Sequence, residues 1–153
     1  MSKKKKNIST SPSTDKEYND FIKNLKLIAL GLGSSSSKLE RGNLIRLRDK
    51  KDAELRKITA VYEVSSSSDD HFDLEGKFNF SCADRQGGES PLVIECRIDA
   101  HFHGKRPVNK EFAKRFAESE FRFVVWPFFR QFVFDMTARM AIPPVAIPLS
   151  DDK

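Results

Sequence analysis

Apolar and polar residues alternate with a period of two through the middle of the chain. The segment HFDLEGKFNFSCA (71–83) places one apolar set on a single face, and LVIECRIDAHF (92–102) repeats the pattern. The first set is Phe72, Leu74, Phe78, Phe80 and Cys82; the second is Leu92, Ile94, Cys96, Ile98, Ala100 and Phe102. Gly87 and Gly88, in the connection, are free to adopt positive φ. The pattern predicts two half-buried strands joined as a long antiparallel hairpin.

Two earlier segments predict two more strands. LRKITAVYEV (55–64) alternates, whereas LKLIALGL (25–32) is apolar on both faces, with Leu25 and Leu27 on one and Ile28, Leu30 and Leu32 on the other. Such a segment is either covered on both sides or changes phase at a β-bulge. The serine runs at 33–37 and 65–70 predict loops. Residues 38–53 are too charged for an assignment.

Beyond Gly104 the apolar period becomes helical. Phe112 and Phe116 predict a short helix with Asn109 as its N-cap. A second helix is predicted to begin near Val125, because proline is tolerated in a first turn and Pro127 would lie there. The prolines of IPPVAIPL end it. Its apolar stripe, expected to face the core or a second subunit, is Val125, Phe129, Phe132, Met136 and Met140.

The predicted fold class is therefore α+β, with a four-stranded antiparallel sheet followed by two helices packed on one face. The 153 residues suit one domain. Residues 1–20 are rich in Lys and Ser and lack a hydrophobic pattern, so we expect a disordered tail followed by a single domain over 21–153.

Charge and hydropathy limit the classes of partner and location. Residues 1–24 supply +3 of the net charge of +5, which argues against a strongly basic nucleic-acid-binding face on the rest. The Lys3–Lys6 run is interpreted as a solubilising tail rather than as a contact for nucleic acid or anionic lipid. Arg122 and Arg130 interrupt the most apolar run, so we expect no membrane insertion. With no signal peptide pattern, the expected location is the cytoplasm.

No residue set indicates catalysis, and we predict no enzyme, cofactor or metal site. Cys82 and Cys96 are expected to be small buried hydrophobic groups, although a redox or metal pair is the alternative. His101 and His103 share a strand face without an evident third ligand, so polar-face histidines are favoured over a metal site. The GLG at 31–33 is too short for a phosphate-binding loop.

The carboxy-terminal third resembles a known family. VWPFFRQFVFDMTARMAIPPVAIPL (125–149) is similar to the second helix and following segment of SecB export chaperones. The matching residues are Trp126, Pro127, Phe128, Arg130, Met136, Arg139 and Pro143. The order of the predicted elements extends the resemblance to about residues 22–149.

This resemblance implies a homotetrameric, ATP-independent holdase, assembled as a dimer of dimers, that binds unfolded or export-bound polypeptides in hydrophobic grooves. In the family, long helices pack between dimers and strands of two subunits pair. The client would be an exported chain or an unstable antitoxin. The candidate client-binding residues are Trp126, Phe128, Phe134, Ile142, Val145, Ile147 and Leu149.

Two departures from the family argue against docking to the translocase ATPase: the domain is slightly basic, and the chain stops at SDDK without a zinc-binding tail. The alternative is a SecB-like α+β oligomer that binds a small apolar ligand between sheet and helices, or that is purely structural. Continuous exposed grooves would favour the chaperone, and a closed cavity would favour the ligand binder.

Overall fold

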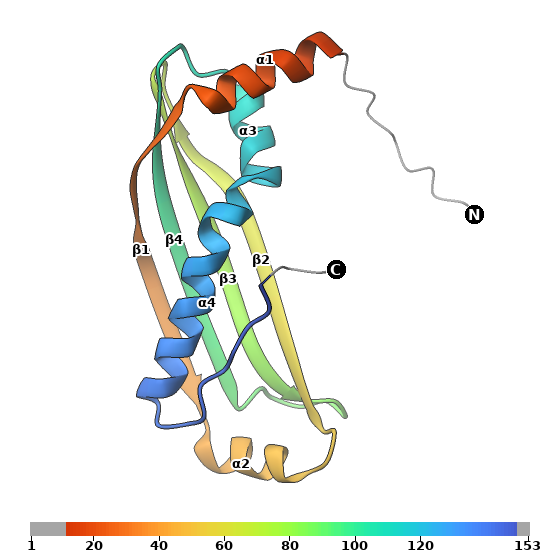
Figure 1. Cartoon of the computed structure of the whole chain (residues 1–153). Helices are drawn as coiled ribbons and strands as arrows, with labels where there is room; N and C mark the ends of the chain where they lie inside the picture. Colours follow the sequence, from red (N-terminus) through yellow and green to blue (C-terminus); the bar gives the residue numbers. More distant parts are fainter. Residues whose placement is uncertain (1–11, 150–153) are drawn as a thin grey trace, which may run out of the picture.

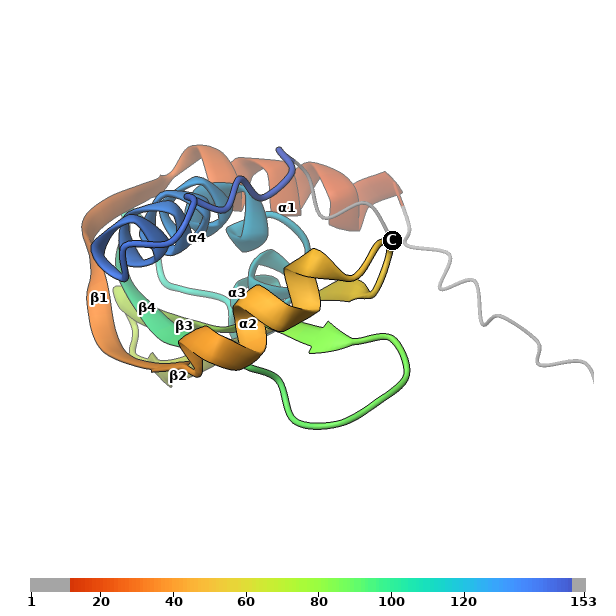
Figure 2. The same ribbon diagram turned by 90° about the horizontal axis from the view of Figure 1, so that it is seen from below.

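Residues 12–149 are described by the computed structural model, which confirms the α+β class (Figure 1). One long sheet carries α3, α4 and the carboxy-terminal segment on one face, while α1 and α2 lie at its two ends (Figures 1 and 2). The elements are α1 (Pro12–Lys23), β1 (Leu25–Leu39), α2 (Arg41–Asp49), β2 (Glu54–Ser67), β3 (His71–Asp84), β4 (Leu92–Gly104), α3 (Lys110–Ser119) and α4 (Phe121–Arg139).

The sheet has the strand order β1-β4-β3-β2, and all neighbours are antiparallel. The predicted β3–β4 hairpin is confirmed: Phe72 lies opposite Phe102 and Phe80 opposite Ile94, all four buried. These inner-face side chains form the floor of the core, and the alternate residues face outwards. Because β1 and β2 are the edge strands, each has one backbone edge that pairs with no other strand of the described residues.

β1 owes its ambiguous pattern to a change of phase. The register skips Ile28, so that Leu27 lies opposite Phe102 and Leu30 opposite Ala100. This β-bulge brings the leucines of β1 to the inner face together, as one of the two predicted alternatives requires. A second register shift falls at Gly33. A side chain there would clash, because its Cβ would lie 2.1 Å from Asp99 Oδ2.

The serine runs are strand in part, which corrects the prediction of loops. Ser34–Ser37 continue β1, where they pair with residues 94–97 of β4, and Ser65–Ser67 end β2. Strand pairing uses backbone groups, so it continues where the side chains are small and polar. Only residues 68–70 form the turn into β3.

α4 begins at Phe121 rather than near Val125, so Pro127 lies inside the helix and not in its first turn. Pro127 is exposed, as is Phe123, whose carbonyl loses its intrahelical donor. Because both residues are exposed, water can replace the missing N–H at that carbonyl.

α1 occupies part of the segment for which disorder was predicted; residues 1–11 lie outside the described residues. Tyr18 is buried, and its hydroxyl donates a hydrogen bond to the Glu120 carboxylate. The guanidinium of Arg115 lies 3.9 Å from the Tyr18 ring centroid and pairs with Asp15 at 3.0 Å. Burial, with the bond to Glu120, raises the pKa of Tyr18 to about 12. The apolar side of α1 is short, which is why no stripe was visible in the sequence.

α2 closes the other end of the sheet within the segment that received no assignment. Leu44 and Leu47 are its buried side chains. Arg41 donates to the carbonyls of Met140, at 2.6 Å, and Ala141, at 3.1 Å. α2 therefore caps the carboxyl end of α4.

The last turn of α4 has the hydrogen bonds of a Schellman motif. The Ile142 N–H donates to the Thr137 carbonyl at 3.3 Å, and the Ala141 N–H donates to the Ala138 carbonyl at 3.0 Å. Ala141 consequently adopts a φ of 54°, the left-handed region that glycine occupies without steric cost.

Ala141→Gly should stabilise the protein by roughly 0.5–1 kcal/mol. Removal of the backbone strain of a left-handed alanine outweighs the greater conformational entropy that glycine gives the unfolded chain. Urea denaturation at fixed protein concentration measures the change. The matched control is Ala138→Gly, within α4, which should destabilise by about the same amount. Destabilisation by both substitutions would contradict the assigned helix end.

Candidate polypeptide-binding surface

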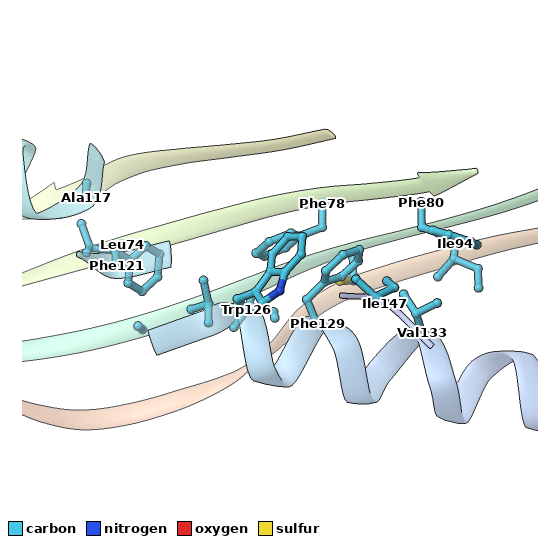
Figure 3. Close-up of a cluster of buried hydrophobic side chains, with 14 of the residues drawn as sticks. Leu74, Phe78, Phe80, Ile94, Ala117, Phe121, Trp126, Phe129, Val133 and Ile147 are labelled. Carbon is cyan, nitrogen blue, oxygen red and sulfur yellow. The ribbon is translucent and has the colours of Figure 1, made fainter. Parts of the chain in front are cut away.

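The sheet-facing side of α4 is filled by large side chains. Phe129 stacks on Phe78 of β3, with ring centroids 4.4 Å apart, and the Trp126 and Phe129 centroids are 5.5 Å apart (Figure 3). Of the predicted stripe, Val125 and Phe129 are fully buried, while Phe132, Met136 and Met140 are half-buried at its border. The buried side of α4 is Phe121, Val125, Trp126, Phe129, Val133 and Thr137.

The segment after α4 turns back and runs along the helix on its β2 side (Figure 1). Trp126 Nε1 donates to the Pro148 carbonyl at 3.0 Å, and Arg130 Nε donates to the Ile147 carbonyl at 2.8 Å. The Val145 N–H donates to Thr137 Oγ1 at 3.0 Å. Because Trp126 and Arg130 are four residues apart, they share one face of α4 and reach adjacent carbonyls.

This arrangement places four of the seven candidate client-binding residues in the core instead of on the surface. Trp126, Ile142, Val145 and Ile147 are all buried. The segment has its backbone carbonyls bound by α4 and its apolar side chains directed into the protein. Leu149, in contrast, is 81% exposed.

The outward side of α4 is also apolar. Phe123 is 65%, Phe128 53% and Phe134 43% exposed. Phe128 and Phe134 were candidates from the sequence; Phe123 was missed because the helix was expected to begin after it. A helix with apolar residues on every side is characteristic of an element covered all round, but nothing among residues 12–149 covers the outward side.

β1 adds apolar area beside α4. Leu27, at 41%, and Leu32, at 54%, are exposed although both are in register with buried β4 residues on the inner face. At 100° per residue, Phe128 projects from α4 opposite Trp126 and Arg130, and hence away from the carboxy-terminal segment and towards β1. We call Phe123, Phe128, Phe134, Leu27 and Leu32 the apolar surface.

The exposed charged residues of α4 are Arg122, Asp135 and Arg139. The Arg122 guanidinium lies 4.6 Å from the Phe123 ring centroid, and Gln131 donates to Asp135 at 2.8 Å. An apolar area with a sparse polar rim can bind chains of varied sequence, because burial of apolar area is non-directional. It supplies no group positioned for bond making.

The cysteines are free thiols on the buried face of the sheet, as expected. Desolvation raises the pKa of Cys82 and of Cys96 to about 12. Cys82 Sγ also donates to Glu54 Oε1 at 3.3 Å, which supports its neutral form. Both groups are therefore protonated at neutral pH and poorly nucleophilic.

The histidines lie on the outer face, away from the apolar surface. His101 Nδ1 is 2.5 Å from Asp73 Oδ1, and the His71 and His101 ring centroids are 5.1 Å apart. Within residues 12–149, no group of three or more His, Cys, Asp or Glu is placed to hold a metal ion. None of the helices in this part of the chain is both long and apolar enough to cross a membrane.

The fold defined by this sheet and these helices is that of SecB-like chaperones. The chain is similar to the solved structure of the Mycobacterium tuberculosis Rv1957 SecB-like chaperone in complex with a ChAD peptide from the Rv1956 HigA1 antitoxin. The TM-score is 0.69 with 14% identity, over 90% of this chain and 99% of that one. A Streptococcus agalactiae protein of unknown function matches at a TM-score of 0.45 and 8% identity, over 81% and 96% of the two chains. No family model and no curated protein matches the sequence.

Thr137→Val should release the carboxy-terminal segment, because it removes the acceptor for the buried Val145 N–H. The expected loss is about 1–3 kcal/mol of unfolding free energy, the cost of an unsatisfied buried donor. Hydrogen exchange at the Val145 amide should accelerate, whereas Thr137→Ser, which keeps the hydroxyl, should retain protection. Equal exchange in the two variants would contradict the assigned bond.

Both thiols should resist modification in the folded protein. At pH 8, well below the pKa of about 12, an aromatic disulfide reagent should react slowly with native protein and fully after unfolding in urea. Absorbance of the released thiolate measures the rate. Rapid native reaction of either cysteine would show that this part of the core opens.

Proposed function

We propose that this protein is a SecB-like, ATP-independent holdase that binds unfolded polypeptides. The single observation that carries the proposal is the apolar surface, formed by the outward side of α4 and the adjoining part of β1. Its location on a fold shared with a SecB-like chaperone adds support. An extended apolar segment of a client would be held at the part of this surface formed by Phe128, Leu27 and Leu32, by burial of the client's side chains.

The proposed assembly is a homotetramer made as a dimer of dimers. Phe123 and Phe134 lie about one-third of a turn from Phe128 around α4, so the helix has two apolar directions to cover. A second subunit over Phe123 and Phe134 would leave Phe128, Leu27 and Leu32 beside it as the rim of a groove. β1, an edge strand, would pair with a second copy as the family resemblance implies.

The proposed client is a non-native polypeptide in the cytoplasm, either an exported chain or an antitoxin. The SecB-like neighbour was solved with an antitoxin peptide, which supports recognition of a polypeptide segment. We do not include docking to the translocase ATPase, because the domain is slightly basic.

The small-ligand alternative has less support from the packing. Stacked rings occupy the space between sheet and α4, with Phe78 and Phe129 4.4 Å apart. The exposed apolar area lies outside this layer. A ligand site between the sheet and α4 would require displacement of core side chains.

In the test, the protein should suppress aggregation of a chemically unfolded client without nucleotide, as followed by light scattering. Phe128→Ser should weaken client binding by roughly 5- to 10-fold, since a half-exposed Phe contact is worth about 1–1.5 kcal/mol. The matched control is Val61→Ser, which removes an equally exposed apolar side chain from the outer face of the sheet.

Molecular mass must be measured for each variant, because loss of assembly would also reduce activity. Phe123→Ser should lower the mass, and Phe128→Ser should leave it unchanged. Failure of the wild-type protein, at stoichiometric excess, to suppress aggregation would end the holdase proposal. If Val61→Ser weakened client binding as much as Phe128→Ser does, the apolar surface would not be the client-binding site.

A further inference from the structure

Positive charge is concentrated at one end of the molecule. We define the α2 end as residues 38–57 with the 84–86 turn; it contains nine Lys and Arg against five Asp and Glu, a net charge of +4. Residues 1–24 supply +3 of the total of +5, so all other residues together carry −2. The α2 end is therefore the cationic pole of the folded domain.

The two parts of this end are held together by direct contacts. The Arg85 N–H donates to the Ala53 carbonyl at 2.9 Å, and Lys50 pairs with Asp84 at 3.6 Å. The turn after β3 thus lies against the loop between α2 and β2, and Figure 2 views the molecule from this end.

Some cations at this end neutralise local acids, and others do not. Arg48 and Arg56 both pair with Glu54, at 3.5 and 3.0 Å. The side chains of Arg46, Lys51, Lys57 and Arg85 are exposed and have no ion pair among the described residues. These four cations are available to an external anion.

Exposed aliphatic side chains accompany them. Ile45 of α2 is half-exposed although its neighbours Leu44 and Leu47 are buried, and Leu55 of β2 is also exposed. Leu55 and Lys57 alternate along β2, so they share its outer face. Cations interspersed with aliphatic groups match a surface that carries both acidic and apolar residues.

We propose that the α2 end binds an acidic segment of a polypeptide partner that also carries aliphatic residues. Carboxylates would pair with the four free cations, and Ile45 and Leu55 would take up the aliphatic side chains. This inference is independent of the proposed holdase activity.

The observations favour a polypeptide over the other polyanions. The α2 end contains no aromatic residue on which a nucleic acid base could stack. A membrane would require an apolar helix face, but Leu44 and Leu47 are committed to the core of this protein.

The experiment measures fluorescence anisotropy of a labelled peptide of repeated Glu-Glu-Leu on the full-length protein. Peptides of repeated Gln-Gln-Leu and Glu-Glu-Ser test the two components separately. The Glu-Glu-Leu peptide should bind at least tenfold more tightly than either of these two peptides. Its binding should weaken several-fold as ionic strength rises from about 0.05 to 0.3 M.

The combined variant Arg46→Glu, Lys51→Glu and Arg85→Glu should abolish binding of the acidic peptide. Its matched control is Lys105→Glu, Lys110→Glu and Lys114→Glu, which makes the same change in net charge with exposed lysines at the opposite end of the sheet. The milder Arg46→Gln, Lys51→Gln and Arg85→Gln variant, with circular dichroism of each protein, separates loss of charge from loss of folding.

Loss of binding in the α2-end variants with retention in the control would support the proposal. Equal loss in both sets would overturn it, because net charge alone would then explain binding. Tighter binding of an RNA oligonucleotide or of phosphatidylglycerol vesicles than of the acidic peptide would overturn the class of partner. Aggregation suppression of a neutral client should be unchanged in every charge variant, so failure of this proposal is distinguishable from failure of the holdase proposal.

Discussion

α4 is apolar on all sides, whereas the sheet offers one inner face, and this mismatch governs the rest of the structure. Phe129 and Trp126 fill the sheet side against Phe78. The carboxy-terminal segment covers a second side, held by hydrogen bonds to Trp126 and Arg130. The remaining sides, with Phe123 and Phe128, are exposed in the part of the chain that the structure describes. Fold and proposed function thus share one cause: the helix has more apolar area than one sheet and one short segment can bury.

Sequence alone was most informative where each face of a strand has one environment. β3 and β4 are central strands with one buried and one outward face, so their alternation was unambiguous. β1 was harder because a single skipped residue, Ile28, reverses the phase, and side-chain patterns do not reveal which residue the pairing skips. Its serines were predicted to be a loop, but they continue the strand because backbone pairing does not require apolar side chains. α1 was missed because Tyr18, Phe21 and Ile22 make too short an apolar repeat to separate from a disordered tail.

The candidate site was predictable in kind but not in detail. The excess of rings near α4 was evident from composition, and Phe128 and Phe134 are exposed. The segment 142–149 was expected to line a groove, because prolines exclude it from a regular central strand. Its apolar side chains instead point inwards, since Trp126 and Arg130 bind its carbonyls from one face of α4. That outcome depends on where the segment meets the helix, which is a tertiary contact that no local pattern encodes.

The apolar surface and the α2 end lie at different places on the same fold and would bind through different interactions. Apolar burial acts at contact and tolerates varied sequences, whereas an uncompensated charge acts over about a Debye length of 10 Å and orients an approaching partner. Arg41 joins them structurally: it donates from α2 to the carbonyls of Met140 and Ala141, where α4 ends. α2, which carries one of the free cations, Arg46, therefore also fixes the end of the helix that carries the exposed rings. A partner bound at the α2 end would consequently lie at a fixed distance and direction from a polypeptide held along α4. One acidic, partly apolar chain could therefore contact both surfaces only by following the length of the helix.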